Sequence, residues 1–116
     1  MLKLGTYPTN GTDDEQQVYK TACQLVSTLQ QDYDNKYHGV ANYSFELITT
    51  GRKYYKIIAK NQGVHAFIDK KTGDVYKPAS YKAPAKIVRY NLLDINSCAK
   101  LFFSNPDWAG GYLYLR

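Results

Sequence analysis

The fold is decided by residues 43–77, YSFELITTGRKYYKIIAKNQGVHAFIDKKTGDVYK, in which apolar and polar residues alternate between turn signals. Alternation with a period of two is typical of half-buried β-strands, and glycine-containing clusters mark the turns that separate them. We therefore expect an antiparallel meander of three or four short strands. The first predicted strand begins at Tyr43 and ends at Thr50-Gly51. The others are Arg52 to Lys60, Val64 to Asp69 and Val75 to Lys77.

The turns within this stretch are short enough to form hairpins. Lys71-Thr72-Gly73 joins the last two runs, and its final glycine suits a type I turn followed by a left-handed residue. Asp69 and Asp74 flank this loop, and we expect their carboxylates to support the turn by hydrogen bonds. In the run from Arg52 to Lys60, alternation places Tyr55, Ile57 and Ala59 together on one face.

An amphipathic helix precedes the meander. Thr12 and Glu15 form a Thr-x-x-Glu capping box, and Asp13 and Asp14 place negative charge at the positive end of a helix. Helical spacing predicts a helix from about Asp13 to Asn35 that covers one face of the sheet. Its apolar face comprises Val18, Ala22, Leu25, Val26, Leu29 and Tyr33.

The residues after the meander predict a loop, a helix and a strand. Pro78 to Lys86 contains two prolines and indicates an ordered surface loop. We expect a second helix over Asp94 to Phe103, ended by Asn105-Pro106-Asp107, and a final strand over Tyr112 to Leu115 with Leu113 and Leu115 on one side and the tyrosines on the other. The inward residues of that helix would be Ile95, Cys98, Leu101 and Phe102.

The composition indicates one α+β domain that spans residues 1–116. Hydrophobic residues make up 44% and charged residues 22% of the 116, which is typical of a soluble globular protein. No run approaches the roughly 18 apolar residues of a membrane span, and the N-terminus lacks the apolar run of a signal peptide. We expect no membrane association, and we interpret Cys23 and Cys98 as buried free thiols of a cytoplasmic protein.

The formal charge of +5 is unevenly distributed. Residues 1–51 carry three basic and six acidic groups, residues 52–89 carry ten and two, and residues 90–116 carry two of each. The basic segment also contains Phe67 and several of the twelve tyrosines, so we predict a basic, tyrosine-rich binding surface. The residues assigned to it are Arg52, Lys53, Tyr54, Lys56, Lys70, Lys71, Tyr76, Lys77, Tyr81, Lys82, Lys86, Arg89 and Tyr90.

This basic segment has three interpretations. In the first, its lysines form the solvated face of the sheet and discourage edge-to-edge pairing of strands, as lysines commonly do. Lysines beside aromatic rings also match single-stranded nucleic acid, because phosphates bind lysines and bases stack on rings. An acidic protein partner is the third interpretation. No motif of a known nucleic-acid-binding domain occurs in the chain.

The sequence contains no catalytic or metal-binding signature, so we expect a non-enzymatic protein without a cofactor or metal. His38 and His65 form no metal-ligand spacing with Cys23 and Cys98, and His65 is interpreted as a packed strand residue whose neighbours in sequence point to the other face. Gly110-Gly111 lacks the lysine of a phosphate-binding loop.

Residues 65–94, HAFIDKKTGDVYKPASYKAPAKIVRYNLLD, contain the elements Lys-Thr-Gly-Asp, Val-Tyr-Lys and Lys-Ala-Pro-Ala-Lys, of which Lys-Ala-Pro-Ala-Lys is the more specific and the hairpin element occurs in many unrelated sheets. This segment, about a quarter of the chain, resembles one found in small uncharacterised proteins of tailed bacteriophages. The resemblance implies a phage origin and assigns no activity to any residue.

These observations favour an accessory binding protein in the host cytoplasm. Its basic, tyrosine-rich surface would engage a host protein, a defence component or nucleic acid. The alternative is a minor virion protein of the capsid, neck or decoration type, in which tyrosines lie between subunits; a homo-oligomer is compatible with both. A small enzyme or ligand-sequestering protein would require a pocket, which sequence does not reveal.

Overall fold

The structure is a computed structural model, which describes residues 13–37, 44–60, 63–104, 106 and 110–113. Its elements follow one another along the chain as a helix, five strands, a second helix and a short 3-10 turn. They are α1 (Asp13–Tyr37), β1 (Phe45–Ile48), β2 (Tyr54–Ala59), β3 (Gly63–Asp69), β4 (Asp74–Tyr76), β5 (Tyr90–Asn91), α2 (Ile95–Phe103) and η1 (Gly111–Leu113).

The five strands form one antiparallel sheet in the order β1-β2-β3-β4-β5, which confirms the predicted meander. The expected α+β class is likewise confirmed. The fifth strand was not predicted, because Tyr90–Asn91 is too short to show alternation. Gly73 has a φ of 78° at the end of the β3–β4 turn, as the hairpin prediction required.

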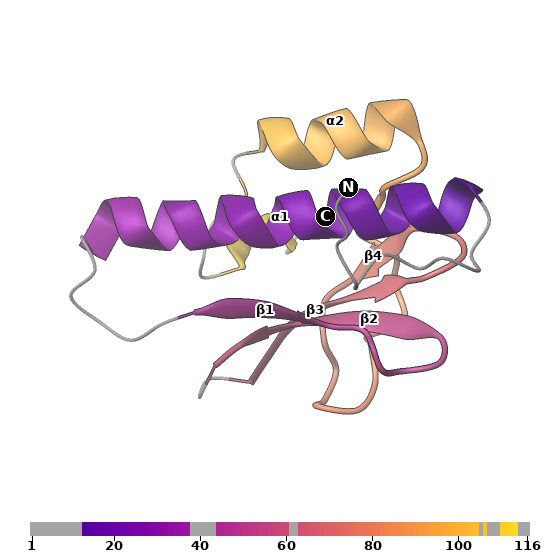
Figure 1. Cartoon of the computed structure of the whole chain (residues 1–116), viewed down its shortest axis with the longest axis horizontal. Coiled ribbons are helices and arrows are strands. Elements are labelled where there is room, and N and C mark those ends of the chain that lie inside the picture. Colours follow the sequence, from indigo (N-terminus) through magenta and orange to yellow (C-terminus); the bar gives the residue numbers. More distant parts are fainter. Residues whose placement is uncertain (1–12, 38–43, 61–62, 105, 107–109, 114–116) are drawn as a thin grey trace.

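Helix α1 lies across one face of the sheet, and α2 lies on the side of α1 away from the sheet (Figure 1). The predicted face of α1 is buried, and the helix ends at Tyr37, two residues beyond the expected end. Thr12 of the proposed capping box and Tyr43 of the first run lie outside the described residues. The core between α1 and the sheet includes Leu25, Leu29 and, on β2, the predicted Tyr55, Ile57 and Ala59.

Helix α2 begins as predicted after Asp94, whose side chain accepts a hydrogen bond of 3.0 Å from the Ser97 N–H. Leu101 is fully buried, but Ile95 is 84% exposed, so its predicted inward position is wrong. At 3.6 residues per turn, Ile95 lies about 120° around the helix from Leu101. Cys23 and Cys98 are free and only partly buried, since both lie at the margin of the core.

The predicted final strand is wrong over its described residues. Gly111–Leu113 forms a 3-10 turn, closed by a hydrogen bond of 3.0 Å from the Leu113 N–H to the Gly110 carbonyl. Tyr112 is buried as well as Leu113, because the Tyr112 carbonyl accepts a hydrogen bond of 2.9 Å from the hydroxyl of Tyr90. The remaining tail residues, Tyr114 and Leu115, lie outside the described residues.

His65 is a packed residue, as expected. Its neighbour Ala66 was expected on the opposite face of the sheet, but Ala66 belongs to the same core cluster as Phe45 and Tyr112, which the His65 ring contacts. Its ring meets Phe45 edge-on at 5.5 Å and stacks on Tyr112 at 5.6 Å, both measured between ring centroids. Its Nε2 is 2.9 Å from the Tyr112 hydroxyl. The pairing of β2 with β3 shifts register at Ile57/Ile58, and such a bulge brings a strand residue out of simple alternation.

Candidate functional site

The predicted basic, tyrosine-rich surface is divided between two places in the structure. One group lies on the face of the sheet opposite α1, and a second group surrounds a cavity at one end of the sheet, beside the first turn of α1. Tyr90 belongs to neither group, because it is 2% exposed and is held in the core by its bond to Tyr112. Its assignment to the surface was therefore wrong.

The first group, here called the outer cluster, consists of Tyr54, Lys56, Phe67, Tyr76 and Tyr81. Cross-strand pairing aligns three of them, because Phe67 on β3 is opposite both Lys56 on β2 and Tyr76 on β4. Tyr54 meets Phe67 and Tyr76 edge-on, at centroid distances of 5.7 and 6.0 Å. The Lys56 ammonium lies 4.2 Å from the centre of the Tyr81 ring, within the usual range of cation–π contacts.

The segment between β4 and β5 places Tyr81 on this cluster. It crosses the face of the sheet opposite α1 (Figure 1) and folds back on itself through a bridge between Pro78 and Pro84. The Ser80 hydroxyl accepts hydrogen bonds of 3.2 Å from the N–H groups of Lys82 and Ala83. Tyr81 thus stands on an ordered loop, as predicted for Pro78 to Lys86, and remains 61% exposed.

The outer cluster is more closed than a nucleic-acid platform. Phe67, expected to present its ring, is 1% exposed beneath Lys56 and Tyr54. Tyr76 is half-buried, and burial followed by the charge of Asp74 raises the pKa of its hydroxyl. Of the rings in the cluster, only Tyr81 is mostly exposed.

The remaining predicted cations lie around the loop. Lys82 and Lys86 are exposed, whereas Lys77 and Arg89 are half-buried. The Arg89 N–H donates to the Val75 carbonyl at 2.7 Å, which ties Arg89 to the sheet. Lys82 and Lys86 are therefore the loop cations most accessible to a partner.

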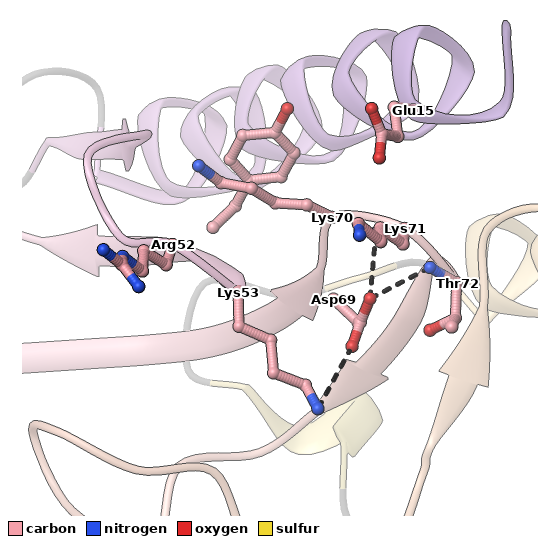
Figure 2. Close-up of a pocket in the computed structure, with 8 residues that line it drawn as sticks. Glu15, Arg52, Lys53, Asp69, Lys70, Lys71 and Thr72 are labelled. Atoms are coloured by element: carbon pink, nitrogen blue, oxygen red, sulfur yellow. Dashed lines mark hydrogen bonds and ion pairs between the residues drawn. The ribbon is translucent and has the colours of Figure 1, made fainter. Parts of the chain in front are cut away.

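The second group surrounds a cavity of about 560 Å³, here called the turn cavity (Figure 2). It lies where the β1–β2 turn and the β3–β4 turn meet the first turn of α1. It is lined by Glu15, Arg52, Lys53, Tyr55, Asp69, Lys70, Lys71 and Thr72. Four of these were predicted as binding residues, and Glu15, Tyr55, Asp69 and Thr72 were not. Glu15 was missed because no local pattern connects residue 15 with a hairpin more than fifty residues later.

Asp69 and Lys70 fix the two turns. The Asp69 carboxylate accepts hydrogen bonds of 2.8 and 2.9 Å from the N–H groups of Lys71 and Thr72, so its predicted role in the turn is confirmed (Figure 2). Asp74 instead binds the side-chain amide of Asn91 on β5 at 2.7 Å. The Lys70 ammonium donates to the carbonyls of Thr49 and Gly51, at 2.7 and 2.5 Å.

Burial changes the acidity of two groups beside the turn cavity. It raises the pKa of Tyr55 to about 12, with smaller contributions from Tyr19, Cys23 and Glu15. It also lowers the pKa of Lys70, while the charge of Glu15 acts in the opposite direction. Tyr55 therefore stays neutral at physiological pH.

The raised pKa of Tyr55 predicts a loss of stability in strong alkali. The unfolded chain releases this proton near pH 10 and the folded chain near pH 12. The stabilisation is complete below about pH 10 and is lost as the pH rises through about 12. Tyr55→Phe should reduce the fall in the urea midpoint between about pH 9 and 11, whereas Tyr81→Phe should leave it unchanged. An equal fall in Tyr55→Phe and the unaltered protein would contradict this assignment.

The described residues contain neither a cluster of metal ligands nor a helix that could span a membrane. No group of three or more His, Cys, Asp or Glu side chains lies close enough to hold a metal ion among the residues placed by the structure. Within the same part of the chain, neither helix is long and apolar enough to cross a membrane.

The fold and its two cationic groups define a small α+β protein with an aromatic, lysine-bearing sheet face and a separate basic cavity. The chain belongs to a family of unknown function, DUF7717, whose model matches residues 5–115. No curated protein and no solved structure matches the chain.

Proposed function

We propose that the chain is a non-enzymatic, phage-encoded accessory protein that binds an acidic surface of a host protein or defence component. The contact would be made by the outer cluster together with the exposed lysines Lys82 and Lys86. The phage origin rests on the resemblance of residues 65–94, and the binding role rests on the site.

One observation carries this proposal: an exposed tyrosine is held on a lysine by an ordered loop. Tyr81 is 61% exposed, and its ring lies 4.2 Å from the Lys56 ammonium. Tyrosine is enriched at protein interfaces because its ring buries a large area at low entropic cost. A loop already ordered by Ser80 and the Pro78–Pro84 bridge reduces the entropy that binding would otherwise lose.

The packing of the cluster favours a protein over a single-stranded nucleic acid. Successive bases stack on exposed aromatic faces. Phe67 is buried, and Lys53 and Lys56 lie over the rings of Tyr54 and Tyr81, at 5.6 and 4.2 Å. A base could stack on these rings only by displacing the lysines, whereas carboxylates of a protein could reach the lysines where they are.

Tyr81→Ala is expected to weaken binding of the partner tenfold or more, since loss of a central aromatic contact commonly costs more than about 1.4 kcal/mol. Lys82→Ala/Lys86→Ala should also weaken binding. The loss of affinity relative to the unaltered protein should be larger at low salt than at high salt, because salt screens the charges of exposed lysines. The partner is first captured from infected cells with the full chain, and its affinity for each purified variant is then measured. Arg89 is left intact in these variants because it is half-buried.

Lys100→Ala is the matched control, because Lys100 is an exposed lysine on α2. It should bind like the unaltered protein. Equal affinity of Tyr81→Ala and Lys100→Ala for the partner would contradict the proposal. Salt-sensitive binding of a labelled single strand, lost in Tyr81→Ala, would instead assign the surface to nucleic acid.

The second candidate, a minor virion protein, is favoured by a different feature. Ile95 and Phe103 on α2 are each 84% exposed, and exposed apolar side chains grouped on one element often mark a contact between subunits. Stoichiometric copurification with mature particles, lost in Ile95→Ser/Phe103→Ser, would support that candidate and exclude the accessory role.

A further inference from the structure

The turn cavity has more positive charge than its own carboxylates balance. Arg52, Lys53, Lys70 and Lys71 face only Glu15 and Asp69, so the lining has a net charge of +2. Its volume, about 560 Å³, is in the range of small-molecule pockets. No member of the outer cluster lines the cavity, and the inference drawn from it does not depend on the proposed function.

Two of the four cations already have partners. Lys70 donates to the Thr49 and Gly51 carbonyls and lies 4.9 Å from the centre of the Tyr55 ring. Lys53 lies 4.0 Å from the Asp69 carboxylate. Both therefore act in large part to hold the two turns together.

The other two cations, Arg52 and Lys71, are uncommitted. Neither the Arg52 guanidinium nor the Lys71 ammonium makes a hydrogen bond or ion pair with another residue of the described segments. Arg52 belongs to the β1–β2 turn and Lys71 to the β3–β4 turn, and the two lie on different sides of the turn cavity (Figure 2). The cavity thus offers two separate positive ends rather than one concentrated positive point.

We propose that the turn cavity binds a small organic dianion with an anionic group at each end, such as a dicarboxylate. Arg52 would hold one end, since its planar fork matches the two oxygens of a carboxylate. Lys71 would hold the other end, and Thr72, which also lines the cavity, has a hydroxyl that can donate a further hydrogen bond. The charge of −2 on such a ligand balances the net charge of the lining, and its organic middle would lie in the cavity between the turns.

Matched probes test this proposal on the full chain. Adipate and hexanoate have six carbons each, but adipate has a carboxylate at both ends and hexanoate at one. Titration calorimetry at constant ionic strength should show adipate binding at least about tenfold more tightly than hexanoate. Inorganic phosphate, a compact anion, should bind less tightly than adipate. Equal affinities for adipate and hexanoate, or for adipate and phosphate, would overturn the proposal.

Single substitutions identify the two ends. Arg52→Ala and Lys71→Ala should each reduce adipate affinity at least about tenfold and abolish the preference over hexanoate. Glu15→Gln removes a negative charge from the lining and should increase adipate affinity several-fold. Lys100→Ala is the control and should bind like the unaltered protein. Both Arg52 and Lys71 are exposed, so their variants should keep the parental melting temperature. Folded variants with unchanged adipate affinity would overturn the assignment.

Discussion

Phe67→Ala is expected to lower the free energy of unfolding by about 3–5 kcal/mol, the usual loss for a buried phenylalanine. Phe67 is 1% exposed, yet it lies outside the hydrophobic cluster that packs between α1 and the sheet. Its surroundings are the Tyr54 ring at 5.7 Å and the Lys56 ammonium at 5.8 Å. Removing the ring would leave a cavity on the outer face and withdraw support from the whole outer cluster.

The free energy should be measured by urea unfolding of Phe67→Ala beside Phe103→Ala. Phe103 is 84% exposed, so the same chemical change there should alter stability by no more than about 0.5 kcal/mol. A domain of this size is commonly stable by only about 5–15 kcal/mol, so the Phe67 variant should melt far earlier. A loss below about 1 kcal/mol would mean that the outer cluster is not a packed layer.

This layer matters for the proposed function, because a packed Phe67 supports Tyr54 and also Lys56, which contacts the Tyr81 ring. Phe67→Leu retains most of the apolar volume and should lose less stability than Phe67→Ala. If it also retains partner binding, the role of Phe67 is to support the surface, and the contact itself belongs to Tyr81 and the lysines.

Periodicity predicted the elements that have one buried face. The 3.6-residue spacing of α1 and the alternation of Tyr55, Ile57 and Ala59 each place apolar residues toward a single core, and the structure confirms them. Periodicity also predicted the strand that became β3, but not the burial of both its faces, since Ala66 to Asp69 are all buried. Because α1 covers one face and the outer cluster the other, alternation no longer separates inside from outside there.

The sites could be predicted only in part, since they depend on contacts between distant segments. The sequence indicated which segment is basic. It did not indicate that some residues of this segment lie on the outer face of the sheet and others around the turn cavity beside α1. Glu15 lines the turn cavity only because α1 begins beside the β3–β4 turn. Tyr90 and Tyr112 are buried because they bind each other across 22 positions. Such pairings leave no local signal.

Gly73→Ala is expected to destabilise the protein by about 2–5 kcal/mol, because two costs add at this position. The φ of 78° disfavours a residue with a Cβ by about 1–2 kcal/mol. That Cβ would also lie 3.2 Å from the Leu93 backbone nitrogen and from its Cγ, and 3.3 Å from Cγ2 of Val18. Overpacking of this kind costs about 1–3 kcal/mol.

Relief of this contact would disturb three elements at once. The Leu93 N–H donates to the Asn91 side chain at 2.8 Å, and the Leu92 N–H donates to the Gly73 carbonyl at 2.8 Å. The backbone of Leu93 therefore cannot retreat without loosening the link between the β3–β4 turn and β5. Val18 is fully buried on α1 and has little space to move. The turn cavity should be affected as well, since Thr72 immediately precedes the substituted residue.

Gly63→Ala separates the two costs. Its φ of 115° is also unfavourable to a residue with a Cβ, but an added Cβ there would meet no described atom within 4 Å. Gly63→Ala should therefore show the backbone cost alone, and Gly73→Ala should melt several degrees lower, since 1 kcal/mol corresponds to about 4 °C in a domain of this size. Equal melting temperatures would show that Leu93 and Val18 yield to the added methyl group, and that only the left-handed backbone makes glycine necessary at position 73.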